Sequence, residues 1–433
     1  MIPLYFIFLL LIGLYNSKNQ TKSSYLNLSR SLTLPSFVAT LVTTWYGGIL
    51  EIGRFSYENG IVTWIIFGFY YYLAALVYGF IIGPKLYKNN IITIPEYFKI
   101  YYGKIPGKIS AIIILLISSP APYVLIFATI ISHVYGFNLH LSAIIGIILS
   151  MGYISVGGFK SIINTDKFQF ILMYLGFIFI FFYLLCTYGG LEFIQNNVPE
   201  KNLKLAGNFS LGFIFSWSLI AMITFIDPNI FQRIYASKDK TIIKNGFVIS
   251  VIFWFIFDFL TISVGIYASA IIDSNSMIGS PYLILSDKIL PPFYKNIFYL
   301  ALLSVVMSTI DSFSFVSAET IKNNFLSKKM NYKYAIQSGL IITALISYII
   351  VINFTYVIEI WYLSGTIGAS VLLVPFLNSI FLKRKSKYPI LLMILPLIIC
   401  LYWMSLGNPM GVDAIYPGII SSSIIYYSTL DNE

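Results

Sequence analysis

The hydrophobic pattern of this chain consists of long apolar runs separated by short stretches that contain most of the charged residues. A helix crosses a hydrocarbon core of about 30 Å with roughly 20 apolar residues, and most of the runs are long enough for this. The pattern therefore predicts about thirteen transmembrane helices, of which the fifth and the thirteenth are short. The predicted segments cover approximately residues 2–15, 34–55, 62–86, 109–135, 141–156, 168–188, 211–234, 248–272, 297–321, 334–354, 357–382, 390–406 and 412–427.

Composition supports an all-α integral membrane protein. Of the 433 residues, 58% are apolar and only 10% are charged, and the mean hydropathy is +0.83, far outside the range of soluble globular proteins. The two cysteines, Cys186 and Cys400, both lie inside apolar runs. This position argues against a disulfide framework and against a thiolate metal site.

The net charge of +10 is explained by where the basic residues lie. Of the 27 Lys and Arg residues, 22 fall in every second connection between the predicted helices, including Lys18 after the first segment, Arg233 after the seventh and Lys383 after the eleventh. This is the positive-inside bias of membrane proteins. It predicts a multi-pass protein of the plasma (inner) membrane with its N-terminus outside and its C-terminus in the cytoplasm, and it argues against a nucleic-acid partner.

Two predicted helices are interrupted near their middle, the second by Gly47-Gly48 and the seventh by Asp227-Pro228. They are five segments apart, and an odd offset gives them opposite directions in the membrane, as in inverted-repeat transporters. The glycines alone favour close helix packing. A proline and an acid at membrane depth are harder to explain without an ion or a substrate beside them.

Five stretches of the sequence, in this order, resemble signatures of the sodium:solute symporter family. They are SLTLPSFVATLVTTWYGG, GPKLYKNNIITIPEYFKIYYGK, VGGFKSIINTDKFQFILM, FIDPNIFQRIYASKD and VVMSTIDSFSFVSAETIKNNF. The resemblance implies a leucine-transporter-like core of five plus five helices in inverted repeats with peripheral helices, and alternating access driven by sodium. Members of the family import sugars, proline, pantothenate, sialic acid and other small solutes.

The implied domain organisation follows the repeats. Residues 34–188 would form the first five-helix repeat and residues 189–382 the second, inverted repeat. Residues 1–33 would add a peripheral helix and a cytoplasmic loop, and residues 383–433 two further peripheral helices. No cofactor is expected, with sodium as the coupling ion, and the oligomeric state is not predicted.

The resemblance implies a sodium site between the first broken helix and the helix that carries the MST motif. Ser308 and Thr309 would supply hydroxyl ligands, and Leu41, Thr44 and Val305 would supply backbone carbonyls. Sodium is a hard cation that prefers oxygen ligands, and neighbouring helical residues lie about 100° apart, so that two hydroxyls can face one groove. The alternative is that both hydroxyls bond back to carbonyls of their own helix.

Three further groups of charged residues have candidate roles. The resemblance links Asp166 to sodium release, with a solvated or capping aspartate as the alternative. Glu51 and Arg54 are spaced for an ion pair that is structural or gating. Asp311 is expected to pair with another polar group.

The solute is expected near the midplane beside the broken helices, where Thr43, Trp45, Tyr46, Asp227 and Asn229 are the candidate contacts. Relatives often carry an uncharged amide in place of Asp227. An acid there favours a cationic or amine-bearing solute, or a proton that takes part in coupling.

The sequence thus predicts a sodium-coupled secondary active symporter for a small organic solute in the lipid bilayer, and not an enzyme, since His133 and His140 do not converge with acids. Two alternatives stay open. One is a proton-coupled transporter of the same fold, with Asp227, Asp258 and Asp311 as carriers. The other is a membrane-embedded solute sensor that acts through a separate partner.

Overall fold

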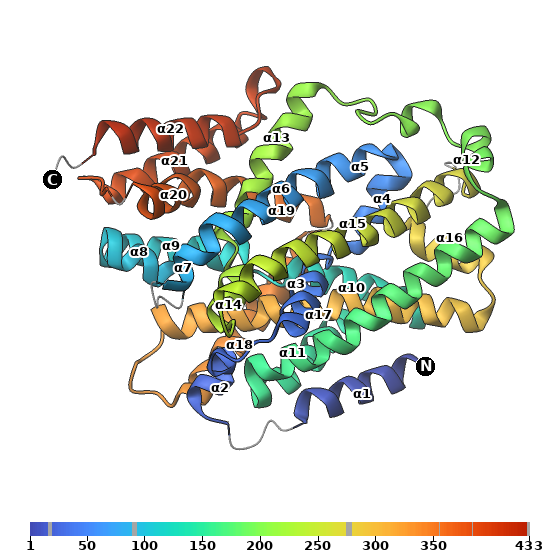
Figure 1. Cartoon of the computed structure of the whole chain (residues 1–433), viewed down its shortest axis with the longest axis horizontal. Coiled ribbons are helices and arrows are strands. Elements are labelled where there is room, and N and C mark those ends of the chain that lie inside the picture. Colours follow the sequence, from blue (N-terminus) through green and yellow to red (C-terminus); the bar gives the residue numbers. More distant parts are fainter. Residues whose placement is uncertain (16–19, 89–92, 274–278, 355, 383, 431–433) are drawn as a thin grey trace.

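The computed structural model describes residues 1–15, 20–88, 93–273, 279–354, 356–382 and 384–430, and within these ranges the chain is helical and contains no strand (Figure 1). Lys18 and Lys383 lie outside the described residues. The α-helices are α1 (Ile2–Leu14), α2 (Lys22–Asn27), α3 (Leu34–Trp45), α4 (Ile49–Asn59), α5 (Val62–Trp64), α6 (Tyr70–Val77), α7 (Gly83–Lys88), α8 (Ile94–Tyr102), α9 (Lys104–Ile117), α10 (Ala121–Tyr135), α11 (Leu139–Tyr188), α12 (Leu191–Asn197), α13 (Leu211–Ala221), α14 (Pro228–Ala236), α15 (Lys240–Ile271), α16 (Pro281–Ile289), α17 (Pro292–Asn324), α18 (Tyr332–Asn353), α19 (Val357–Gly368), α20 (Val374–Phe381), α21 (Pro389–Ser405) and α22 (Ile415–Ser428). Short 3-10 or π-helical turns are η1 (Leu28–Arg30), η2 (Ile65–Phe69), η3 (Tyr78–Ile82), η4 (Glu200–Leu203), η5 (Met222–Ile226), η7 (Ala369–Leu373) and η8 (Pro409–Gly411).

Every predicted apolar segment coincides with a helix or a broken helix. By length and composition, seven helical stretches of the described chain can cross a membrane, or eight if the bent pair of α13–η5 and α14 is one span. The helices α1, α3 and α21 are apolar but shorter. The count of thirteen spans and the inverted five-helix repeats therefore stay predictions.

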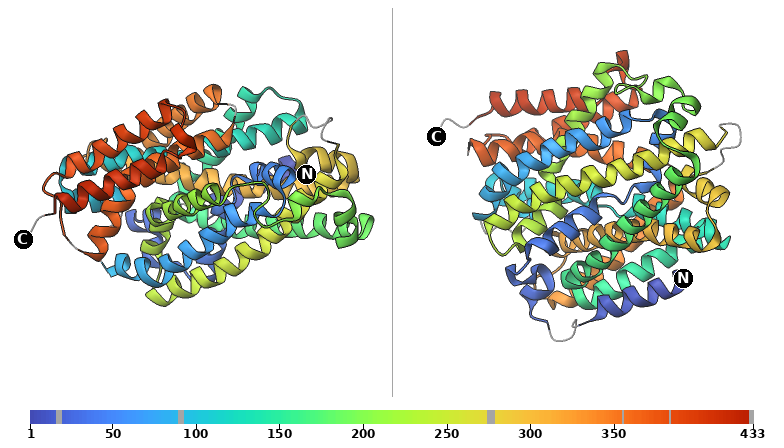
Figure 2. Two further views of the ribbon diagram at one scale, coloured as in Figure 1. Left: turned by 90° about the horizontal axis from the view of Figure 1, so that it is seen from above. Right: turned by 45° about the vertical axis from the view of Figure 1, so that its right-hand side comes forward.

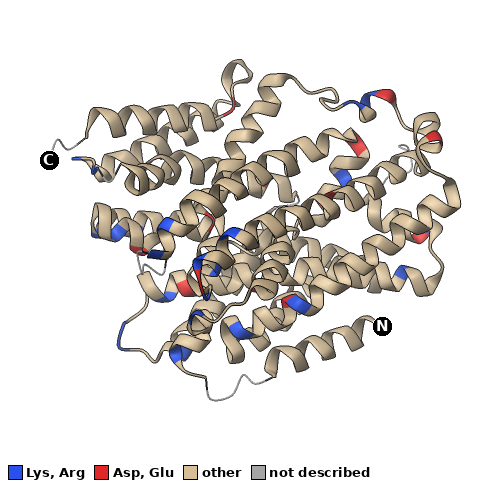
Figure 3. Cartoon of the chain, in the orientation of Figure 1, with Lys and Arg blue, Asp and Glu red and all other residues tan. Residues whose placement is uncertain are grey.

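The helices pack around α17, of whose most apolar window 94% is buried. In the views of Figures 1 and 2, α1 lies along one edge of the bundle and α21 with α22 along the opposite edge. Their assignment as peripheral helices outside a core of two repeats stays a prediction. Lys and Arg lie mainly toward the left of Figure 3, at one end of the bundle, which is the asymmetry that the positive-inside rule requires.

Both predicted interruptions are present. The first broken helix stops at Trp45 and resumes at Ile49. The second bends by 40° between η5 and α14, where Asp227 is extended and caps the new helix, whose first residue is proline. A Cβ added to Gly48 would lie 1.8 Å from the ring of Trp361, so close packing and the break occur at the same place.

The longest helical element, α11, reverses direction at Gly158. Fifty residues of straight helix would be about 75 Å long. Yet Tyr153 bonds Asp311 of α17, and a Cβ on Gly176 would lie 2.3 Å from Ala301 of the same helix. Both arms of α11 therefore pack on one stretch of α17, and the turn between them is made at Gly158, which has φ 59° and ψ −146°.

Replacing Gly158 with alanine is expected to destabilise the protein by about 1–3 kcal/mol from backbone strain alone. The added Cβ would also meet the Tyr25 carbonyl oxygen at 2.5 Å. Gly152→Ala is the matched control on the same helix, because a Cβ there has nothing within 4 Å. Thermal unfolding in detergent should show a lower Tm for Gly158→Ala only, and equal Tm values would contradict this account of the turn.

Candidate sodium and solute site

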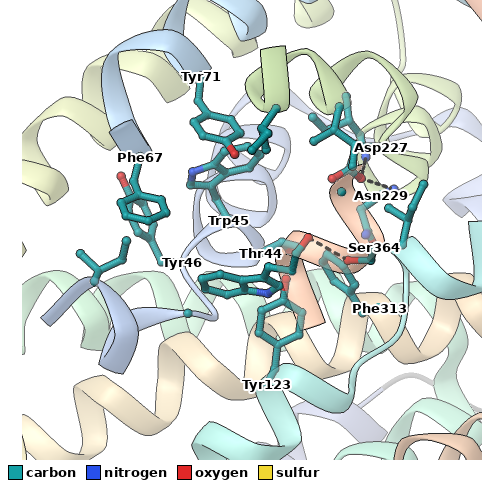
Figure 4. A pocket seen from close by; sticks show the side chains of 18 of the residues that line it. Thr44, Trp45, Tyr46, Phe67, Tyr71, Tyr123, Asp227, Asn229, Phe313 and Ser364 are labelled. Carbon is teal, nitrogen blue, oxygen red and sulfur yellow. Dashed lines mark hydrogen bonds between the residues drawn. The ribbon is translucent and has the colours of Figure 1, made fainter. Parts of the chain in front are cut away.

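A cavity of about 190 Å³ opens between the two broken helices. Trp45 and Tyr46 at the end of α3 line it from one side, and Asp227 and Asn229 at the start of α14 line it from the other (Figure 4). Four of the five predicted solute contacts thus converge on one cavity. Thr43 does not, because its hydroxyl donates to the Ala39 carbonyl of its own helix at 2.9 Å and its side chain is fully buried away from the cavity.

Aromatic residues that the sequence did not single out complete the wall. Tyr71 packs edge-on against Trp45 with ring centroids 5.0 Å apart, and Tyr123 packs in the same way against Phe313 at 4.9 Å. Trp361 of α19 also faces the cavity. These rings come from five separate helices, so no local spacing in the sequence marks them as neighbours.

The residues of the predicted sodium site meet where α3 ends against α17. The Thr309 hydroxyl lies 3.1 Å from the Thr44 carbonyl oxygen and 3.2 Å from the Val305 carbonyl oxygen. The Ser308 hydroxyl donates to Asp166 at 2.6 Å. Leu41 lines the neighbouring cavity one turn before Thr44. The side chains and carbonyls gathered here offer only oxygen, which is the donor set that a sodium ion prefers.

The alternative, that both hydroxyls bond back to carbonyls of their own helix, holds for Thr309 but not for Ser308. Thr309 donates back to the carbonyl of its own helix, and also across to α3. Ser308 bonds only to Asp166 of α11 among the described residues. Two helices and one carboxylate are therefore joined through this pair.

The carboxylate of Asp166 is fully buried and Asp166 lies inside α11, which contradicts the alternative of a solvated or capping aspartate. It accepts hydrogen bonds from Thr40 and Ser308. A third neighbour of this carboxylate is Arg233, whose guanidinium lies 3.8 Å away. Asp166 thus faces the predicted sodium site and a permanent cation at the same time.

The sequence predicts Arg233 in a basic cytoplasmic loop, and this prediction is wrong. The side chain of Arg233 is fully buried in the helix bundle. Its Nη2 donates to the hydroxyls of Thr40 at 2.8 Å, Thr44 at 2.7 Å and Ser312 at 2.8 Å. The available signal was that a charge inside an apolar segment is by default a functional candidate.

Other candidate charges have identified partners. Asp311 bonds Ser150 and Tyr153, as the predicted polar pairing requires. Asp258 lines the cavity and bonds Tyr72. The predicted pair of Glu51 and Arg54 is formed at 3.9 Å, a long contact of the kind that stabilises little at a partly exposed position.

A polar cluster away from the cavity ties α16 to its neighbours. Asp287 lies 2.7 Å from His133 of α10, 3.1 Å from Lys295 and 2.8 Å from the Tyr299 hydroxyl. Partial burial alone would raise the pKa of the Asp287 carboxyl, but these three hydrogen bonds outweigh it and hold the pKa below its usual range. The prediction that His133 does not converge with an acid is therefore wrong, because Asp287 of α16 lies beside it.

The comparison with known families decides what kind of protein carries this site. The model of the sodium:solute symporter family matches residues 25–392 of the chain. The chain belongs to the sodium:solute symporter family. Membership in this family supports sodium-coupled transport and is consistent with a protein that is not an enzyme.

Curated relatives point the same way. The chain is 24% identical over 361 residues to sodium/proline symporter 2 of Staphylococcus saprophyticus, covering 75% of this chain and 67% of that protein. It is also 24% identical over 359 residues to the sodium/proline symporter of Staphylococcus aureus, with the same coverage.

Solved structures show the fold. A Na⁺-coupled sialic acid symporter, solved in a substrate-bound outward-open state, superposes with a TM-score of 0.81 at 16% identity, over 98% of this chain and 94% of that chain. The nucleobase-cation-symport-1 family transporter Mhp1 superposes with a TM-score of 0.61 at 14% identity, over 95% of each chain. The leucine-transporter-like fold expected for this symporter is therefore confirmed in outline.

Proposed function

We propose that this symporter imports a small organic solute across the plasma membrane by alternating access, with sodium as the coupling ion. The observation that carries the proposal is the contact of Thr309 with the Thr44 carbonyl, beside a cavity that both broken helices line. Ion and solute would then bind to the same helix ends, which is the arrangement that couples their movements.

In this proposal the sodium ligands are the hydroxyls of Ser308 and Thr309 and the carbonyls of Leu41, Thr44 and Val305. Asp166 accepts the ion on its way out, because it already bonds Ser308. The two five-helix repeats, residues 34–188 and 189–382, would move relative to each other around this site, with the N-terminus outside and the C-terminus in the cytoplasm.

Sodium entry supplies enough free energy for accumulation. A charge moving through 100 mV contributes about 2.3 kcal/mol, and a tenfold sodium gradient contributes about 1.4 kcal/mol. Roughly 3.7 kcal/mol per ion supports a several-hundredfold accumulation of a neutral solute.

The test is a comparison of thermal stability in sodium and in equal potassium, followed by uptake into proteoliposomes with an inward sodium gradient. Ligand binding to the native state raises apparent stability by mass action, so the first step requires no knowledge of the solute. L-Proline is the first labelled probe, because the curated relatives are sodium/proline symporters. Uptake that follows the sodium gradient supports the proposal, and identical stability in both salts contradicts it.

A proton-coupled transporter is the second candidate. Asp258 and Asp311 are buried, Asp227 is half-buried beside the cavity, and each of these carboxylates could carry a proton. Uptake driven by a pH gradient in the absence of sodium would favour this alternative.

A further inference from the structure

The charges around the cavity are not balanced. Three charged side chains line it, namely Asp227, Asp258 and Arg233. Arg233 already pairs with Asp166 and donates hydrogen bonds to three hydroxyls. Burying a carboxylate without an opposite charge is costly, so this region has a deficit of positive charge that a bound cation would remove.

Asp227 caps α14 and faces the cavity. Its Oδ1 accepts hydrogen bonds from the backbone N–H groups of Asn229 at 2.7 Å and Ile230 at 3.2 Å. These are free N–H groups at the start of α14, and the positive end of a helix dipole stabilises an anion there. Both bonds go to Oδ1, and in Figure 4 the carboxylate points toward the aromatic wall.

Aromatic rings that could hold a cationic solute, and an amide that could bond a second polar atom of the solute, line the same cavity as this carboxylate. Trp45 and Tyr71 present ring faces and edges to the same cavity (Figure 4), and an ammonium group over such a ring is attracted by its electron-rich face. Asn229 is 2% exposed, and its amide lies beside the Asp227 carboxylate, but within the part of the chain that the structure describes neither amide atom makes a hydrogen bond of good geometry. Buried polar groups are normally satisfied, so a ligand that bonds Asn229 is expected.

We propose that the cavity recognises a small organic cation: a protonated amine without a carboxylate, on a compact apolar or aromatic body. The ammonium group bonds Asp227, the body lies against Trp45 and Tyr71, and a hydroxyl or carbonyl of the solute bonds Asn229. The cavity volume of about 190 Å³ is below the roughly 300–1,000 Å³ of sites for drug-sized ligands, which limits the solute to a small molecule.

The charge count supports this class over anions and zwitterions. Asp166 lies 3.8 Å from Arg233, and Asp227 and Asp258 line the same cavity as this guanidinium, so one sodium ion and one cationic solute together would balance the three carboxylates. An anionic solute would add a further negative charge next to Asp227. The proposal rests on the sodium-coupled transport proposed above, because the sodium ion supplies one of the two charges.

The experiment compares probes that share a body and differ only in charge, on the purified full chain in sodium. The aromatic set is tyramine, L-tyrosine and 3-(4-hydroxyphenyl)propanoate, and the aliphatic set is isopentylamine, L-leucine and 4-methylpentanoate. We expect the amine of at least one set to raise the Tm and to bind more tightly than its zwitterionic and anionic analogues. Asp227→Asn should weaken amine binding roughly 10- to 100-fold, as expected for loss of a hydrogen bond to a charged group.

Asp239→Asn is the matched control. Asp239 caps α15 through the same two backbone bonds, at 2.8 and 3.0 Å, but lies at an exposed position. Amine affinity should be unchanged in this variant. Asparagine still accepts a capping hydrogen bond, so both variants should fold.

The outcomes separate this proposal from the proposed function. Sodium-specific stabilisation without binding of either amine would overturn the organic-cation site and leave sodium coupling intact. Tighter binding of an anion or a zwitterion, or an unchanged amine affinity in Asp227→Asn, would also overturn it. Amine binding without any sodium effect would support the site and count against sodium coupling.

Discussion

Replacing Arg233 with methionine is expected to lower the free energy of unfolding by roughly 3–5 kcal/mol, the cost of removing one partner from a buried ion pair. The guanidinium is fully buried and lies 3.8 Å from Asp166, which is also fully buried. Without it, Asp166 keeps only hydroxyl partners, and the hydroxyls of Thr44 and Ser312 lose a charged donor. Chemical denaturation or thermal melting in detergent measures the loss.

Two controls make the interpretation specific. Arg54→Met removes an arginine whose side chain is 32% exposed and whose ion pair is 3.9 Å long, so it should cost less than about 1 kcal/mol. The double variant Arg233→Met/Asp166→Asn removes both charges and should recover a large part of the stability. If Arg233→Met were as stable as Arg54→Met, the buried pair would not stabilise the folded protein.

Replacing Thr309 with alanine is expected to abolish the stabilisation by sodium relative to potassium. At a sodium concentration 100 times its Kd, binding to the native state is worth about 2.7 kcal/mol. The Thr309 hydroxyl lies within 3.2 Å of two carbonyl oxygens that are proposed ligands. Its removal takes away one ligand and the contact between α17 and the end of α3.

The readout is the difference in Tm between the two salts, and not the Tm itself. Thr309→Ser keeps the hydroxyl and should keep the sodium effect. Thr343→Ala is the matched control, because Thr343 of α18 is buried and its hydroxyl has no partner within the described residues. A sodium effect of full size in Thr309→Ala would place the ion elsewhere.

The sequence predicted those features that depend on local chemistry. Proline at the start of α14 and the glycine pair after α3 each impose a break on their own segment, and both breaks are present. The apolar runs located the helices because hydrocarbon burial requires length and composition only. The gathering of Thr44, Val305, Ser308 and Thr309 followed from a family resemblance and was not deducible from spacing.

Features that depend on distant packing could not be predicted in this way. Arg233 follows the break by six positions, and whether it faces a loop or the core is decided by the 40° bend. The aromatic wall combines Tyr71, Tyr123 and Trp361 from helices far apart in sequence. Thr43 and Thr44 are adjacent, and which of them faces the cavity is set by the rotation of α3 against α17.

The closeness of Arg233 to Asp166 has a consequence for how fast an ion could leave. When a mobile ion dissociates from a buried carboxylate, it ordinarily leaves an uncompensated charge behind. This cost raises the barrier to dissociation and slows release of the ion. Here a covalently attached cation stays 3.8 Å from the same carboxylate after the departure. An ion at Ser308 and Thr309 would therefore exchange quickly instead of remaining as a permanent resident, as a protein that must complete many cycles requires.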